Sequence, residues 1–218
     1  MYSLVRNIIV LTIFLFTANG YSQVFDAGIK AGVASSQISG DGYSGFHKAG
    51  IVAGGFARMN LSDRSHFQFE ITFTQKGSRR NPKTSEGDDD FFLLRLDYIE
   101  IPLLFLYDYK NFTFEVGPYF STLVNEYMED EFGTTSIPEG FDQFSRFDLG
   151  LSAGISYNFT EQLIMNWRFS NSIVPVRDFE SKAAILQQLP GQSPLQRFDT
   201  GMYHTYLSFT MNYKFGGN

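Results

Sequence analysis

The chain of 218 residues contains no cysteine and little charge. Without cysteine there is no disulfide, no thiolate metal ligand and no thiol nucleophile. Charged residues make up only 18% of the sequence, below the usual share for a soluble domain, and no basic run offsets the net charge of −6. Such a chain offers no electrostatic basis for binding nucleic acid. It also has no phosphate-binding glycine loop, so the sequence indicates no cofactor.

Long apolar runs are missing as well, apart from one at the N-terminus. Residues 1–22 carry one positive charge, Arg6, then the apolar run Ile8–Phe16, and then small residues at Ala18, Gly20 and Ser22. This order predicts a signal peptide over 1–22 and a single domain over 23–218. The alternative, an N-terminal membrane anchor, is disfavoured because the run is shorter than the roughly 20 residues of a spanning helix. A membrane location would therefore require a β-barrel.

Aromatic residues are plentiful, with 24 Phe and 12 Tyr spread along the chain, and they recur with a period of two. Every second residue from Phe67 to Phe73 is Phe or Ile, and Gln, Glu and Thr stand between them. This alternation predicts strands with one apolar and one polar face. Eight segments follow or approach the pattern: 24–36, 46–60, 66–78, 95–108, 111–125, 146–160, 162–176 and 201–216.

The connections between these segments alternate in length. Three are short, at 60–65, 108–110 and 158–161, and four are long, at about 37–45, 77–94, 126–145 and 175–200. Short turns on one rim and long loops on the other are typical of outer-membrane barrels. The sequence predicts an all-β fold: an eight-stranded antiparallel up-and-down transmembrane β-barrel with short periplasmic turns and four long extracellular loops.

The apolar face has two interpretations. It faces lipid in a membrane barrel, and it faces the interior in a soluble, lipocalin-like ligand binder. The opposite face favours the membrane barrel, because it carries many small residues and charges of both signs, which suit a narrow lumen. We expect these charged residues in the lumen: Lys30, Lys48, Arg58, Glu70, Glu100, Glu115, Asp148 and Arg168. The candidate partners for Glu100 and Glu115 are Lys30, Lys48 and Arg168.

Several motifs resemble the PorT-like outer-membrane β-barrel family of Bacteroidetes-type bacteria. They are Gly28–Val33, Gln75–Gly77, Tyr98–Leu104, Gly117–Ser121 and Asp148–Gly150 followed by Gly154. The resemblance implies a barrel with an outer-membrane location, and it carries no catalytic signature. The family's founding members are linked to type IX protein secretion. The last strand ends in alternating aromatics, which resembles the signal read by the barrel-insertion machinery.

Acidic clusters mark two of the long loops. They contain Glu86, Asp88, Asp89 and Asp90 in one loop, and Glu129, Asp130 and Glu131 in the next. Such carboxylates are candidates for binding Ca²⁺ or Mg²⁺, with a bridge to lipopolysaccharide, and the alternative is an ordinary solvated loop. His204 and Asp199 at the outer rim come nearest to a catalytic pair, and the alternative there is an ordinary rim histidine.

The favoured function is therefore that of a non-enzymatic outer-membrane protein whose extracellular loops bind partners or serve envelope assembly or secretion. The alternatives are a narrow channel or small-solute transporter, a loop-borne enzyme, and the soluble ligand binder. The expected partners are outer-membrane lipid and lipopolysaccharide, the insertion machinery and an envelope protein.

Overall fold

The computed structural model describes residues 25–39, 45–82, 91–130, 132–135, 144–178 and 201–215. The predicted signal peptide lies outside these ranges. No helix within them is long and apolar enough to cross a membrane. The strands are β1 (Phe25–Ser39), β2 (Lys48–Asn60), β3 (Ser65–Arg80), β4 (Phe92–Tyr109), β5 (Phe112–Asp130), β6 (Gly133–Thr135), β7 (Phe147–Asn158), β8 (Leu163–Ser172), β9 (Arg177–Asp178) and β10 (Gly201–Phe215).

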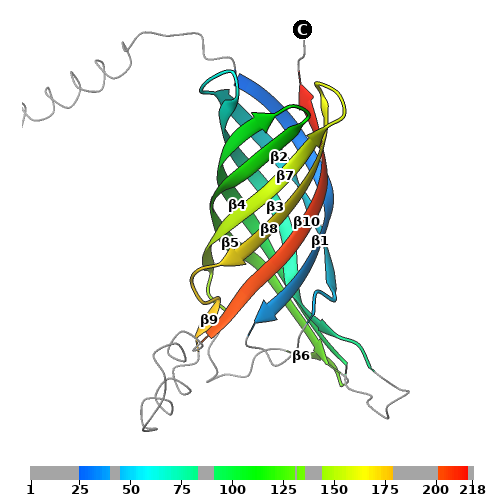
Figure 1. Ribbon diagram of the computed structural model, residues 1–218. Coiled ribbons are helices and arrows are strands. Elements are labelled where there is room, and N and C mark those ends of the chain that lie inside the picture. Colours follow the sequence, from blue (N-terminus) through cyan, green and yellow to red (C-terminus); the bar gives the residue numbers. More distant parts are fainter. Residues whose placement is uncertain are drawn as a thin grey trace, which may run out of the picture.

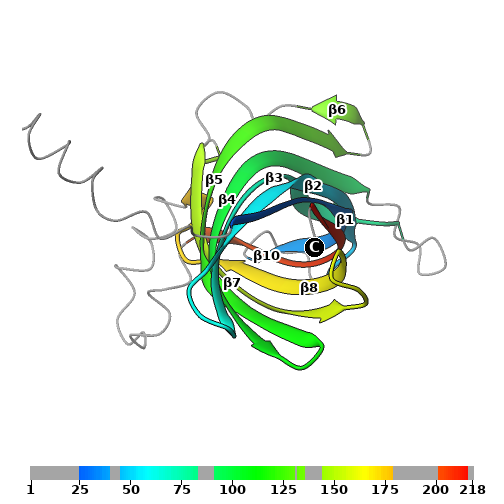
Figure 2. The same ribbon diagram turned by 90° about the horizontal axis from the view of Figure 1, so that it is seen from above.

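Eight of these strands form one closed antiparallel ring (Figure 1). The order is β1-β2-β3-β4-β5-β7-β8-β10, and β10 pairs with β1 to close it. Figure 2 shows the same ring from above, with β6 outside it. A closed sheet leaves no open edge, so its backbone groups are satisfied even within hydrocarbon. The prediction of an eight-stranded barrel is confirmed.

The two faces of the wall are sorted as the alternation predicts. On β3, Glu70 is fully buried inside the ring, whereas the next residue, Ile71, is 52% exposed on the outside. The outer face of the other strands is likewise apolar, with exposed Val33, Ile51, Val116, Leu151 and Leu207. This arrangement rules out the lipocalin-like alternative, because an apolar belt on the outside needs lipid rather than water. The lumen is not purely polar, since it also holds Val52, Phe56, Leu104, Leu106 and Ile164.

Two of the short turns are stabilised by the same kind of hydrogen bond, from a backbone N–H to a side-chain hydroxyl. Between β2 and β3, Ser65 N donates to Ser62 Oγ at 3.1 Å. Between β7 and β8, Leu163 N donates to Thr160 Oγ1 at 2.9 Å. Ser and Thr hydroxyls stabilise tight turns in this way. Between β4 and β5, Lys110 takes a positive φ of 56°.

Three strands continue past the ring on the side of the long loops. β2 pairs with β3 only up to Thr74, and β7 pairs with β5 only up to Thr122, whereas β4 stays paired with both neighbours up to Phe92. We call the projecting part the blade: residues 75–80 of β3, 92–97 of β4 and 125–130 of β5, extended by β6. In Figure 1 it extends from the ring toward β6.

A β-bulge marks the base of the blade. Tyr98 pairs with Leu123 but Asp97 pairs with Asn125, so Val124 is the additional residue. Below the bulge the outer face is apolar, with Ile99 and Phe120 exposed. Above it the outward residues are polar: Asn125 donates to Asp97 at 3.0 Å, and the Arg95 guanidinium lies 5.2 Å from the Tyr127 ring. The bulge therefore lies at the outer boundary of the hydrocarbon layer.

The blade also corrects several predicted boundaries. The second and third long loops were expected at 77–94 and 126–145, but β3, β4 and β5 take up both ends of the first and the start of the second. β8 ends at Ser172 rather than at residue 176. The physical reason for the longer strands is that Leu94, Leu96 and Met128 pack inward against other side chains, which gives the projecting strands a core.

Candidate functional site

The charged side chains of the lumen form two groups. The first, which we call the arginine cluster, consists of Lys30, Glu70, Glu115 and Arg168 from β1, β3, β5 and β8. Nη1 and Nη2 of Arg168 each donate to a Glu70 oxygen at 2.8 Å. Nε of Arg168 donates to Glu115 at 2.6 Å, and Nζ of Lys30 lies 2.9 Å from Glu70. Two cations thus face two carboxylates, and all four are buried.

A polar chain extends the arginine cluster toward the periplasmic mouth. Gln68 Nε2 donates to Glu70 at 2.6 Å, and Arg58 Nε donates to Gln68 at 3.1 Å. Arg58 then lines a hollow of about 280 Å³ at the mouth, together with Asp108, Lys110 and Lys214 among others. The periplasmic half of the lumen is therefore braced by linked ion pairs and amide contacts rather than left as an open pore.

The second group, which we call the lysine cluster, lies nearer the extracellular end. It consists of Lys76, Glu100 and Asp148 with the three tyrosines Tyr98, Tyr119 and Tyr206. Lys76 Nζ lies 2.6 Å from Glu100 and 3.4 Å from Asp148. It also lies 4.6 to 5.0 Å from the centroids of the three rings, within the range of cation–π attraction. Its side chain is fully buried.

The tyrosines of the lysine cluster also satisfy its carboxylates. The hydroxyl of Tyr206 donates to Glu100, and that of Tyr119 donates to Asp148 at 3.3 Å. Ser121 adds a further donor to Asp148 at 3.4 Å. One cation faces two carboxylates here, and hydroxyl donors supply part of the compensation that a second cation supplies in the arginine cluster.

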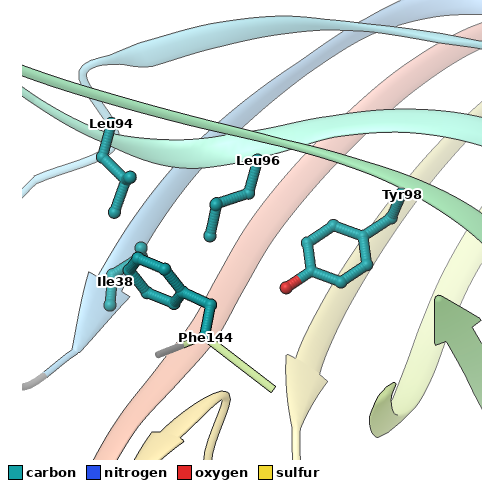
Figure 3. Packing of buried hydrophobic residues seen from close by; sticks show 5 residues of the cluster. All are labelled: Ile38, Leu94, Leu96, Tyr98 and Phe144. Atoms are coloured by element: carbon teal, nitrogen blue, oxygen red, sulfur yellow. The ribbon is translucent and has the colours of Figure 1, made fainter. Parts of the chain in front are cut away.

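An apolar layer covers the lysine cluster on the extracellular side. Ile38, Leu94, Leu96, Tyr98 and Phe144 are all buried and in contact (Figure 3). Leu94 and Leu96 belong to the blade, so the blade supplies one side of this layer. We call it the extracellular cap. From the periplasm outward, the lumen is thus filled by the arginine cluster, the lysine cluster and the cap.

Two glycines of β7 create the space for the two clusters. A Cβ added at Gly154 would lie 2.5 Å from Glu115 Oε1, and a Cβ added at Gly150 would fall on the ring of Tyr119. Each glycine therefore lies directly beneath a side chain of one cluster. Glycine is required at these two positions because it has no side chain, and not because of its backbone freedom.

All eight lumenal residues expected from the sequence are buried in the structure. Among the expected partners, Arg168 pairs with Glu115, whereas Glu100 pairs with Lys76, which was not among the expected lumenal charges. Lys48 lies near the extracellular end, where its Nζ donates to the carbonyl of Ala49 at 2.7 Å. The alternation of β3 contains the missed signal, since Lys76 follows Glu70, Thr72 and Thr74 at even positions.

The acidic candidates for a metal site are only partly described. Glu86, Asp88, Asp89, Asp90 and Glu131 lie outside the described residues. Glu129 and Asp130 were expected in a loop but lie on β5, where Glu129 accepts from Tyr127 and Asp130 accepts from Phe132 N. In the described ranges no group of three His, Asp or Glu side chains could hold a metal ion.

His204 is not a rim residue. It is fully buried, and its Nε2 lies 3.2 Å from the hydroxyl of Tyr98 in the lysine cluster. The interpretation of His204 as an exposed histidine, catalytic or ordinary, is therefore wrong, because its even position on β10 turns it into the lumen. Asp199 lies outside the described residues.

Comparison with known proteins agrees with this architecture. The crystal structure of Neisserial surface protein A has a TM-score of 0.54 with this chain, at 15% identity, covering 87% of this chain and 97% of that one. Ail, the attachment invasion locus protein of Yersinia pestis, has a TM-score of 0.48 at 12% identity, covering 87% and 98%. At 15% identity, Neisserial surface protein A shows similarity of the fold alone. No curated protein sequence matches the chain.

The closed ring, the apolar outer belt and the filled lumen together define an eight-stranded β-barrel of the bacterial outer membrane. The family model described as "Outer membrane protein beta-barrel domain" matches residues 19–177. The match spans well over half of the chain, so the chain belongs to this family.

Proposed function

We propose that the protein is a non-enzymatic binding protein of the outer membrane, with a role in envelope assembly or secretion that it performs at its extracellular end. The observation that carries this proposal is the contrast between a filled lumen and a projecting blade. An eight-stranded ring has an interior that side chains just fill, which disfavours a channel. A fully buried His204 likewise disfavours a rim hydrolase.

The blade has the features of a contact surface. Its outer face is held in shape by Arg95, Asp97, Asn125 and Tyr127. At its base Val124 is 54% exposed, and near its tip Phe132 is 90% exposed. A rigid polar platform above the membrane, with one exposed apolar residue at the membrane boundary and another near its tip, is suited to contact with another protein.

The narrower parts of the proposal have separate support. Assignment to the PorT-like group, and with it a link to secretion, is based on the motif resemblance. Export through a signal peptide over 1–22 is based on the order of charge, apolar run and small residues. The acidic loop residues remain proposed sites for a divalent cation that bridges lipopolysaccharide, and the aromatic last strand remains a proposed contact for the insertion machinery.

Site-specific photo-cross-linking in living cells tests the proposal. A photoreactive residue replaces Val124 or Phe132 on the blade, and Leu61, which is 54% exposed in a periplasmic turn, serves as the matched control. We expect the two blade positions to give a discrete adduct with an envelope protein that Leu61 does not give. Equal adducts from all three positions, or none from the blade in cells that carry the folded barrel, would contradict the proposal.

A further inference from the structure

The hollow of about 280 Å³ at the periplasmic mouth has a buried floor and an exposed rim. Arg58 of β2 and Ile164 of β8 form the floor, and they are 8% and 3% exposed. The rim comes from the turns after β4 and β7, with Lys110 and Asn111 in the first and Thr160 in the second. The volume is just under the roughly 300–1,000 Å³ of small-molecule sites, so the hollow suits a small molecule or one end of a longer one.

The two turns of the rim are held together at the same end of the ring (Figure 1). Asn158 N donates to the carbonyl of Asn111 at 2.9 Å, which ties the end of β7 to the turn before β5. Asn158 Nδ2 donates to Thr113 at 3.2 Å, and the Thr113 hydroxyl donates to Asp108 at 2.6 Å. The rim is therefore preformed, and a ligand does not have to order it.

Arg58 is a buried cation without a counter-ion. Its Nε donates to Gln68, a neutral amide, and no carboxylate forms an ion pair with it in the part of the chain that the structure describes. Asp108, which lines the same hollow, is engaged elsewhere, since it lies 2.8 Å from His66 Nε2 and accepts from Thr113. Nη1 and Nη2 of Arg58 thus remain available, and an anion bound there would offset the cost of burying the charge.

The other charges of the hollow favour a ligand with a single negative charge. Lys110 and Lys214 line it beside Arg58, and Lys214 lies 3.6 Å from Asp26. Glu161 lies on the exposed rim. The planar fork of a guanidinium matches a carboxylate with two parallel N–H donors. A phosphate would bring a second negative charge close to the carboxylates of the hollow, so a carboxylate fits better.

We propose that the periplasmic mouth binds the carboxylate of a small molecule of the amino-acid class or of the last residue of a short peptide. Nη1 and Nη2 of Arg58 hold the carboxylate, and Lys110 attracts it from the rim. The side-chain amides of Asn111 and Asn158 offer donors and acceptors to a peptide group, and Ile164 offers an apolar contact. The site lies at the opposite end of the barrel from the blade and does not depend on the function proposed there.

Isothermal titration calorimetry of the folded barrel in detergent micelles tests the site. The probes are N-acetylalanine and N-acetyl-trialanine, which carry only the carboxylate charge, and their C-terminal amides. We expect both acids to bind and both amides to bind at least roughly tenfold more weakly. Tighter binding of the trialanine acid would identify a peptide as the ligand, and equal binding would identify a single residue.

Three variants that each remove one positive charge locate the binding. We expect Arg58→Gln to weaken binding of the acids roughly tenfold and Lys110→Gln to weaken it about twofold to threefold. Arg64→Gln is the matched control, because Arg64 is exposed in the periplasmic β2–β3 turn but does not line the hollow, and it should leave binding unchanged.

Folding of each variant is checked by its heat-dependent mobility in SDS, and Lys110→Gln in an exposed turn keeps the test valid if Arg58→Gln does not fold. Equal binding of acids and amides would overturn the carboxylate site. Equal losses from Arg64→Gln and the folded hollow variants would also overturn it, because they would show unspecific attraction to the rim. Tighter binding of inorganic phosphate than of either acid would overturn the choice of a carboxylate.

Discussion

In the periplasmic half of the lumen, Arg168 binds two carboxylates through both edges of its guanidinium, and Lys30 supplies a second cation. In the extracellular half, Lys76 is the one cation of a cluster with two carboxylates, and three tyrosine rings surround it. Strands β3 and β5 contribute side chains to both clusters, and the two clusters neutralise buried charge in two ways.

The difference follows from the shapes of the two cations. A guanidinium is a planar fork that matches carboxylates in pairs, whereas an ammonium is a compact charge that accepts neighbours from any direction. Rings can therefore surround Lys76, and their hydroxyls can serve the carboxylates at the same time. We infer that the arginine cluster mainly holds the strands together, while the lysine cluster and the extracellular cap mainly close the outer end.

The largest effect is expected from Arg168→Leu. It leaves Glu70 with Lys30 as its one remaining cation in the cluster and leaves Glu115 with none. Breaking a buried pair in this way costs about 3–5 kcal/mol. Urea unfolding of the barrel in lipid, followed by the fluorescence of Trp167, measures the loss. The double variant Arg168→Leu/Glu115→Leu should recover part of it, and a double variant less stable than the single one would contradict the ion-pair explanation.

A smaller loss is expected from Lys76→Met. The two carboxylates lose their cation but keep the hydroxyl donors of Tyr206, Tyr119 and Ser121, so we expect a cost at the lower end of the range for a broken buried pair, about 3 kcal/mol. The same unfolding measurement applies. A loss as large as that of Arg168→Leu would show that the tyrosines do not compensate, and the distinction between the two clusters would fail.

The smallest effects are expected from alanine beneath each cluster. Gly154→Ala presses on Glu115 and Gly150→Ala presses on the ring of Tyr119, and overpacking of this kind costs on the order of 1–2 kcal/mol. Gly150→Ala should lower the free energy of unfolding more than Gly154→Ala, because the rigid ring of Tyr119 can move aside less easily than the flexible side chain of Glu115. Gly55 is the control, since its nearest neighbour would lie 3.4 Å from an added Cβ, and Gly55→Ala should be neutral or slightly stabilising. A reversed order would contradict the assignment of the larger cost to the ring of Tyr119.

The sequence predicts the strands and their faces well because period two is a local property. It does not predict which charges meet. Arg168 and Glu70 lie 98 residues apart on strands that are not neighbours, and their contact depends on the stagger of the closed ring. The even positions of β3 place Lys76 in the lumen, although it was not among the expected lumenal charges, and nothing local to β3 predicts that it meets Glu100 and Asp148.

The prolines and the blade illustrate the same limit. The β3–β4 ladder is open at Pro102, between the Phe69–Leu103 and Thr72–Glu100 pairs, because proline has no backbone N–H to donate. The bulge itself lies at Val124, which no proline or glycine marks. The projection of the blade depends on packing of Leu94 and Leu96 against Ile38 and Phe144, contacts that pair distant segments.

Ionic conductance across a planar lipid bilayer tests the central claim most directly, namely that the lumen is filled and the protein works from its surface. With insertion verified and a porin added last as a positive control, wild type should give no steady conductance. Arg168→Leu and Lys76→Met should also be silent, because in each variant the other cluster and the extracellular cap remain. A steady, voltage-independent current from the wild-type barrel would contradict the account and favour a narrow channel.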